Sequence, residues 1–227
     1  MLFRSCRAML RALFQKTGNA VYISHLDLMR LFQRAFKRAG LPLTHTQGFN
    51  PRPSVSIALP LSLGVESQCE LLDFELETDT FSNEDICTRL NQALVEGVHV
   101  LSVYAGGGKI KNLAYLDCAV LLEYDAGVPQ NAAEQIEALF SREEVTVEKK
   151  GKKGVVEQNI ISMIRKISAA PVSGNVVKLE ARVCCQNPSL NPMLLGTAVN
   201  KYLPDLAPDF IRYSRVEIYD TNETIFR

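Results

Sequence analysis

The chain has 227 residues, of which 47% are hydrophobic and 22% charged. This composition is typical of globular proteins and excludes a disordered chain. The formal net charge is zero, which argues against a protein that coats nucleic acid through bulk charge alone. No segment approaches the roughly 18 apolar residues of a membrane span, and residues 1–18 lack a secretory signal pattern, so we expect a cytoplasmic protein without membrane contact.

The six cysteines are scattered along the chain, which favours reduced thiols over a disulfide framework. The sequence has neither a C-x-x-C pair nor the C-x3-C-x2-C spacing that holds an iron–sulfur cluster in radical SAM enzymes. We therefore expect no metal site and no cofactor.

Charge is unevenly distributed in the first hundred residues. Residues 1–55 carry nine basic side chains against the single acid Asp27, a formal charge of +8. Residues 56–100 carry nine acids against Arg89, a formal charge of −8. This asymmetry predicts either an anionic partner for the first segment or an internal pairing of the two segments, and the sequence leaves both open.

The N-terminal pattern predicts two short strands, residues 8–15 and 20–23, followed by an amphipathic helix. Ser24 and Asp27 fit the S-x-x-D capping box at the helix start, and Gly40 marks its end. Apolar residues recur at helical spacing on one face, and the opposite face carries one acid and four cations: Asp27, Arg30, Arg34, Lys37 and Arg38.

Prolines and glycines interrupt residues 44–67, which predicts an ordered loop system rather than a regular element. The rest of the first half predicts a strand at 69–76, a helix at 83–94 and a strand at 98–104. The glycines at 106–108 lack phosphate-loop spacing and predict a flexible linker.

A domain boundary is expected at this linker. Residues 1–107 form an N-terminal α+β domain with the basic helix and the Gly/Pro loop, and residues 108–227 form a C-terminal domain. The second half predicts strands at 114–124, 145–149, 175–184 and 210–219, helices at 131–140 and 191–202, and a short helix near 159–167. This β-α-β-β-α-β order matches the split βαβ pattern, and the first half has a similar order. The expected fold class is therefore α+β, with two ferredoxin-like antiparallel-sheet sandwiches.

Several short motifs lie within about the first 77 residues: FQKTG (14–18), ISHLDLMR (23–30), RAFKRAGLP (34–42), QGFNP (47–51) and residues 61–70. Together they resemble the bacterial radical SAM-linked protein family, a domain of unknown function found beside or fused to radical SAM proteins. The resemblance implies a radical SAM partner more than a reaction. The family usually has histidine where this chain has Arg52, which weakens any mechanism that relies on a second imidazole here.

The helix and the loop supply the candidate binding residues for structured RNA such as tRNA: Arg30, Arg34, Lys37, Arg38, Gln47, Phe49, Asn50 and Arg52. Arginines four residues apart suit successive phosphates, although such a face is often only solvated. The loop side chains could stack on and hydrogen-bond a base, or Phe49 could fill the core of a rigid turn. The favoured hypothesis is a non-catalytic RNA-binding module that works with a radical SAM partner.

Two alternatives remain open. In the first, the chain is a metal-independent RNA-processing or RNA-modifying enzyme whose catalytic residues are His25 and Asp27, although Asp27 also suits a helix cap. In the second, the charged segments dock on a partner protein without nucleic acid. We also expect Glu66, Ser67 and Glu70 to bind the arginines of the helix internally.

Overall fold

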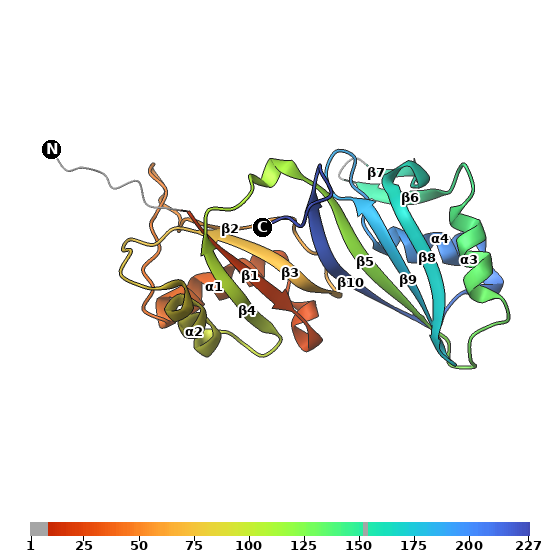
Figure 1. Cartoon of the computed structure of the whole chain (residues 1–227), viewed down its shortest axis with the longest axis horizontal. Coiled ribbons are helices and arrows are strands. Elements are labelled where there is room, and N and C mark those ends of the chain that lie inside the picture. The colour runs from red at the N-terminus through yellow and green to blue at the C-terminus, as the bar shows by residue number, and fades with distance from the viewer. Residues whose placement is uncertain (1–8, 152–153) are drawn as a thin grey trace. The chain divides into compact units, whose positions relative to one another are not determined.

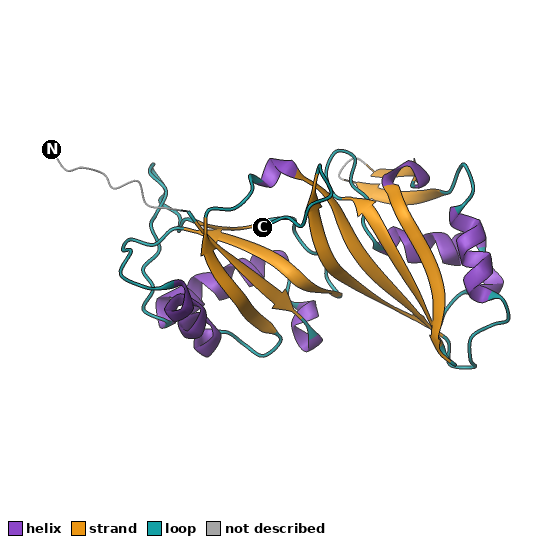
Figure 2. Ribbon diagram, viewed as in Figure 1, coloured by secondary structure: helices purple, strands orange, loops and turns teal. Residues whose placement is uncertain are grey.

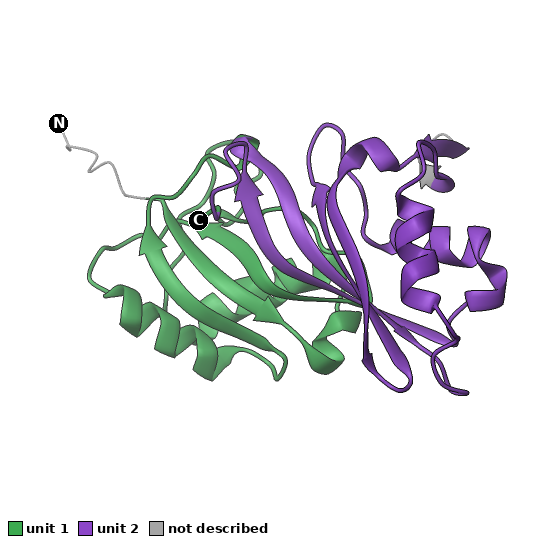
Figure 3. Cartoon of the chain, turned by 45° about the vertical axis from the view of Figure 1, so that its right-hand side comes forward, with its two compact units in different colours: residues 1–111, 226–227 green, residues 112–225 purple. Residues whose placement is uncertain are grey.

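The computed structural model describes residues 9–151 and 154–227 of the chain. The chain forms two compact units, Met1–Lys111 with Phe226–Arg227, and Asn112–Ile225 (Figure 3). Helices and antiparallel strands occur in both units (Figure 2), which confirms the α+β class expected from the sequence. Within the described residues, no helix is long and apolar enough to cross a membrane.

The first unit has a sheet with two helices on one side (Figure 1). Its elements are β1 (Leu10–Lys16), the 3₁₀ helix η1 (Gly18–Tyr22), α1 (His25–Arg38), β2 (Val55–Ile57), β3 (Val65–Phe74), α2 (Asn83–Ala93) and β4 (Val98–Ala105). β1 pairs antiparallel with both β3 and β4. β2 pairs with the last residues of β3, so the strand order is β4-β1-β3-β2.

The core of this unit lies between the sheet and the two helices. Phe14 of β1 meets Phe32 of α1 edge-on, with ring centroids 4.8 Å apart, and Phe36 meets Phe74 of β3 at 4.9 Å. Full burial of one such side chain contributes about 1.5–3 kcal/mol to folding. The predicted apolar stripe of α1 therefore faces the sheet, and the cationic face is left outside.

The second unit has its own antiparallel sheet, again with helices on one side (Figure 1). Its elements are β5 (Leu113–Glu123), α3 (Ala132–Phe140), β6 (Thr146–Gly151), β7 (Gly154–Asn159), the 3₁₀ helix η3 (Ile161–Met163), β8 (Ile164–Ser173), β9 (Val176–Cys184), α4 (Met193–Tyr202), the 3₁₀ helix η4 (Pro204–Leu206) and β10 (Phe210–Asp220). The strand order is β10-β5-β9-β8, and β6 and β7 form a separate two-stranded sheet.

Two local predictions were wrong, and one predicted strand lies in a different sheet. Residues 20–23 are not a strand, because η1 spans Gly18–Tyr22 and buries Ala20 and Val21 in a turn. The short helix expected near 159–167 is a single 3₁₀ turn followed by β8. A strand does occupy the range expected at 145–149, as β6, but it pairs with β7 in the separate sheet, and β8 pairs with β9 in the four-stranded sheet of the unit. Short apolar runs fit a strand or a helical turn equally well, so periodicity could not separate them.

The glycine run after β4 is a site of close packing. A Cβ atom on Gly108 would lie 2.5 Å from the ring of Phe226, and one on Gly107 would lie 2.7 Å from a guanidinium nitrogen of Arg11. The amide of Gly108 also donates to the carbonyl of Arg227 over 2.6 Å. Glycine is needed here because any side chain would displace these neighbours, which linker flexibility alone does not explain.

The cysteines of the described residues are free thiols, as expected. Cys69 is buried in β3 of the first unit, and Cys118 and Cys185 are buried in the second unit. Burial raises the pKa of the Cys118 thiol to about 12 and that of Cys185 to about 11. The thiols of Cys118 and Cys185 are therefore protonated at neutral pH.

Candidate nucleic-acid interface

Helix α1 begins with the predicted capping box. The Ser24 hydroxyl accepts from the Asp27 amide over 3.2 Å and donates to the Asp27 carboxylate over 2.7 Å. The pKa of Asp27 is lowered mainly by the hydrogen bond from the Ser24 hydroxyl, and the hydrogen bond from Arg30 lowers it further. The cap thus fixes the residue at which α1 begins.

The cations of α1 lie on its exposed side. Arg30 bonds Asp27 over 2.9 Å, with 65% and 59% of the two side chains exposed. Arg38 donates to the carbonyl of Ala93 at the end of α2. Among the described residues, Arg34 and Lys37 have no hydrogen-bond or ion-pair partner, and both are exposed. An exposed pair such as Arg30–Asp27 contributes little to stability, so this face is available to an anionic ligand.

Among the described residues, Glu66 and Ser67 of β3 contact backbone amides rather than the helix arginines, which corrects the expected internal pairing for these two residues. Glu66 accepts from the amide of Gly18, and Ser67 accepts from the amide of Cys69. The charge of Glu70 acts on Lys16 of β1.

The acidic and basic segments do meet, but at β1 rather than at the helix. Asp73 forms a two-bond ion pair with Arg11, at 2.5 and 2.9 Å, between directly opposed residues of β3 and β1. The side chains are only 16% and 5% exposed. Internal pairing with the acidic segment therefore accounts for Arg11 of β1, whereas on the helix Arg30 pairs with Asp27 and Arg38 donates to the Ala93 carbonyl.

The loop after α1 is a hydrogen-bonded hairpin with an exposed tip. His45 pairs with Pro53, the Thr46 amide donates to the Arg52 carbonyl over 2.8 Å, and the Arg52 amide donates to the Thr46 hydroxyl over 3.0 Å. The tip carries Phe49, whose exposure of 110% excludes the core-filling alternative. The polar candidates Gln47, Asn50 and Arg52 are exposed beside it. An aromatic ring held wholly in solvent by a braced turn is suited to contact a ligand.

The alternative catalytic pair is not assembled as a proton relay. His25 is the first residue of α1, half-buried, and within the described residues no group orients its imidazole through a hydrogen bond. The Asp27 carboxylate already accepts from Ser24 and Arg30. A general base is normally oriented by a further group, so this geometry favours capping as the role of Asp27.

Sequence reasoning missed a buried cation, Lys16. Its side chain is 1% exposed, and its ammonium donates to the carbonyls of Val21 over 3.1 Å and Ile23 over 2.9 Å. Burial lowers the pKa of Lys16, and the charge of Glu70 partly opposes this. A lone lysine at the end of a strand gave no signal for this role.

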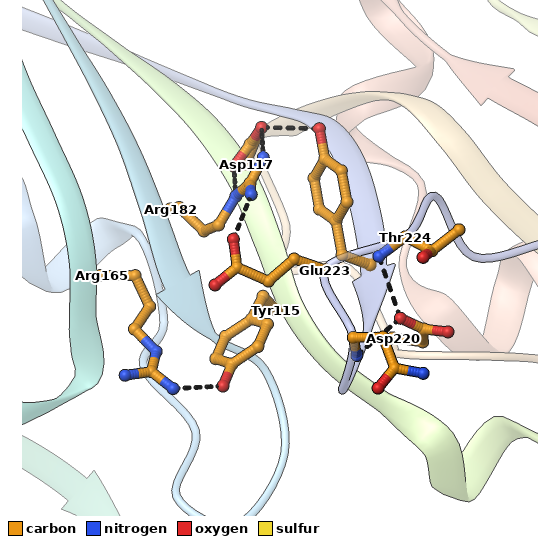
Figure 4. A network of polar contacts seen from close by, with 9 residues as sticks. Tyr115, Asp117, Arg165, Arg182, Asp220, Glu223 and Thr224 are labelled. Carbon is orange, nitrogen blue, oxygen red and sulfur yellow. Dashed lines mark hydrogen bonds and ion pairs between the residues drawn. The ribbon is translucent and has the colours of Figure 1, made fainter.

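A second polar cluster lies on the sheet of the second unit (Figure 4). Asp117 of β5 accepts from Arg182 of β9 over 2.7 and 2.9 Å and from the hydroxyl of Tyr219 over 2.8 Å. Arg182 also bonds Glu223 over 2.8 Å and stacks on the Tyr219 ring at 3.9 Å. The charged groups of Asp117, Arg182 and Glu223 are paired with one another. We therefore assign this cluster a structural role, which is to hold β5, β9 and β10 together.

Burial of the Asp117 carboxylate raises its pKa, but the bonds from Arg182 and Tyr219 outweigh burial and leave the pKa below its ordinary value. The described residues contain no group of three histidine, cysteine or acidic side chains placed to hold a metal ion.

Comparison with known families gives one match over most of the chain. The model for an uncharacterized protein conserved in bacteria, DUF2344, matches residues 9–192. The chain belongs to this family. The matched range includes α1, the hairpin with Phe49 and most of the second unit, so the candidate interface is part of the DUF2344 domain. A comparison with curated proteins gave no match.

Two of the solved structures that are similar to this chain have low sequence identity to it. A Cbf5-Nop10-Gar1 complex has 10% identity and a TM-score of 0.50 over 93% of this chain and 49% of that chain. An unknown protein from Galdieria sulphuraria has 11% identity and a TM-score of 0.26, over 92% and 98% of the two chains. The DUF2344 chain spans about half the length of the chain that it matches in the Cbf5-Nop10-Gar1 complex, and its likeness to that chain concerns the fold alone.

Proposed function

We propose that the chain is a non-catalytic RNA-binding module that recognises substrate, with tRNA as a candidate, for a radical SAM partner. The exposed cationic face of α1 carries this proposal, because four cations lie there with Asp27 as their single acidic neighbour on the helix. Residues four apart on a helix are separated by about 6 Å along its axis, so Arg30, Arg34 and Arg38 form a row. Such a row can follow the phosphates of one strand.

The hairpin tip supports the same proposal. Phosphate contacts position a nucleic acid without reading its sequence, whereas unpaired bases are recognised by aromatic stacking and amide hydrogen bonds. Phe49 supplies the ring, Gln47 and Asn50 supply amides, and Arg52 supplies a further cation. The tip is therefore the part of the surface that we assign to base contacts.

The strand orders support a ferredoxin-like module in each unit. Both β4-β1-β3-β2 and β10-β5-β9-β8 place the fourth strand of the unit beside the first, then the third, then the second sheet strand. We propose two domains, residues 1–107 and residues 108–227, and the change of compact unit after Lys111 supports a boundary in this region. A radical SAM partner is supported by the sequence resemblance alone, and co-purification with such a protein is its direct test.

The salt dependence of RNA binding tests the function. Replacing Arg30 and Arg34 by alanine removes two phosphate contacts, so the slope of log affinity against log salt falls by nearly one unit per contact. The matched control is Lys109→Ala with Lys111→Ala, which removes the same charge from exposed positions of the same unit. Binding to total tRNA is measured by filter retention between low and moderate salt.

An unchanged slope in the Arg30/Arg34 variant, with circular dichroism unchanged, overturns this surface as the RNA site. Incubation with RNA also separates a binder from an enzyme. A cleaved or modified product that forms with the native chain and disappears with His25→Ala contradicts a non-catalytic role.

A further inference from the structure

An exposed apolar group lies around the start of α1, where the cationic face begins. Tyr22, Leu26 and Leu63 are 68%, 67% and 57% exposed. Tyr22 ends η1, Leu26 lies in the first turn of α1, and the amide of Gly64 donates to the carbonyl of Val21 over 3.0 Å, which holds Leu63 beside η1. We call these three residues the apolar platform. Single exposed apolar side chains need no explanation, but three gathered at one end of a cationic face do.

The backbone that carries Tyr22 is rigid on both sides. The buried Lys16 ammonium binds the carbonyls of Val21 and Ile23, the two neighbours of Tyr22 in the chain. On the other side of η1, a Cβ atom on Gly97 would lie 2.4 Å from the Thr17 carbonyl oxygen, so the β4 end packs directly against the turn. The ring is thus displayed in solvent by a fixed backbone. Binding to a preorganised side chain costs less conformational entropy.

We propose that Tyr22 is a base-stacking residue and that the RNA bound by this module is single-stranded. This inference rests on the proposed function. Single-stranded nucleic acid is bound by a cationic surface that follows the backbone together with aromatic rings that stack on its bases. A continuous duplex keeps its base faces covered, so it leaves Tyr22 and Phe49 without a partner.

The order of the elements fits this ligand class. Tyr22 precedes α1, the four cations lie along α1, and Phe49 follows it at the hairpin tip. The 14 residues of α1 span about 20 Å, which leaves room for several nucleotides along the cationic face. Leu26 and Leu63, the other two residues of the apolar platform, add apolar surface that an unpaired base can contact.

The absence of tryptophan from the chain makes a clean optical test possible. Tyr22→Trp introduces a single indole at the proposed stacking position. Titration uses a 12-nucleotide RNA strand and the duplex that it forms with its complement, at about 0.1 M salt. We expect saturable quenching of the indole by the strand and binding of the duplex that is at least about 10-fold weaker.

Side-chain variants test the ring itself. Tyr22→Ala is expected to weaken binding of the strand roughly 5- to 100-fold, and Tyr22→Phe to retain it, because the ring and not the hydroxyl stacks. Phe210→Ala is the matched control, since Phe210 is an aromatic residue of the second unit that is 56% exposed. Its removal is expected to leave the affinity unchanged.

The outcomes separate this inference from the proposed function. If the native chain binds neither strand nor duplex, the proposed function fails and the inference fails with it. If the chain binds RNA and Arg30→Ala weakens binding, but Tyr22→Ala does not or the duplex binds as tightly as the strand, the inference alone is overturned. The platform is then assigned to a partner protein.

Discussion

Phe49 offers the sharpest separation of function from stability at the level of one residue. Its ring lies entirely in solvent, so Phe49→Ala is expected to leave the free energy of unfolding within about 0.5 kcal/mol of the native value. The same change is expected to weaken RNA binding by about 1–3 kcal/mol, the contribution of stacking one base. Thermal unfolding and a binding titration measure the two effects. Phe49→Tyr keeps the ring, and an affinity as low as that of the alanine variant contradicts stacking.

Arg11 is expected to behave in the opposite way. It is 4% exposed, paired twice with Asp73, bonded to the carbonyl of Gly108 and stacked over Phe226 at 5.3 Å. Arg11→Met leaves the largely buried Asp73 carboxylate without its cation, which is expected to cost about 3 kcal/mol in urea unfolding. Adding Asp73→Leu is expected to restore much of this loss.

The control for Arg11 is the exposed pair of Lys178 with Glu180, which lies on β9. Lys178→Met is expected to cost less than about 1 kcal/mol. Equal losses for the two methionine variants rule out a special role for burial at Arg11.

The sequence predicts the role of a residue where residues recur at helical spacing. It does not predict the role where this depends on whether tertiary contacts bury the side chain. Arginines four apart on an amphipathic helix have to share its polar face, so the sequence placed Arg30 and Arg34 outside. Nothing local shows that Lys16 is buried or that Tyr22 is exposed, because both follow from how η1 folds over the Lys16 side chain. The ion pair of Arg11 with Asp73 joins residues 62 apart and depends on strand register.

At the level of elements, α1 and α2 begin with the same type of N-terminal cap. Ser24 caps α1 and Ser82 caps α2, each by accepting from the amide of an aspartate three residues later. Ser24→Ala and Ser82→Ala are each expected to cost about 1 kcal/mol of unfolding free energy. Only Ser24→Ala is expected to weaken RNA binding as well, because only α1 carries the cationic face. A matching loss of affinity in Ser82→Ala indicates general destabilisation instead.

Long amphipathic helices were predicted with their ends, and short segments were not. α1 was identified from its stripe, its capping serine and the glycine that follows it, all of which are local. The turn η1 and the strand β8 depend on contacts from elsewhere in the chain, since η1 is closed by Lys16 and β8 is aligned by β9. The glycines at 106–108 indicate a linker by sequence because the close partners of Gly107 and Gly108, Arg11 and Phe226, are distant in sequence.

For the molecule as a whole, acid stability is expected to depend on Asp117. Its pKa in the folded state lies below the ordinary value of 3.8, so its contribution to stability is present above that pH and is lost as pH falls through the folded pKa. The native chain is therefore expected to lose stability below about pH 5. Asp117→Asn is expected to be less stable at neutral pH and to show a smaller loss in acid.

Urea unfolding at a series of pH values measures this difference. The two free-energy curves are expected to converge as pH falls, because the native carboxylate becomes neutral and the variant has no charge to lose. Curves that stay parallel between about pH 6 and pH 3 contradict a linked proton at Asp117.

The buried cysteines allow the opening rate of each unit to be measured separately. An alkylating reagent attacks the thiolate, and a thiol whose pKa is raised by burial presents almost none at neutral pH, so Cys118 reacts only in molecules whose second unit has opened. Cys69 is 2% exposed, so a reagent reaches its sulfur only when the first unit opens. Peptide mass spectrometry of a timed alkylation therefore yields two separate opening rates from one unmodified chain. These rates show whether the two units open together or one at a time.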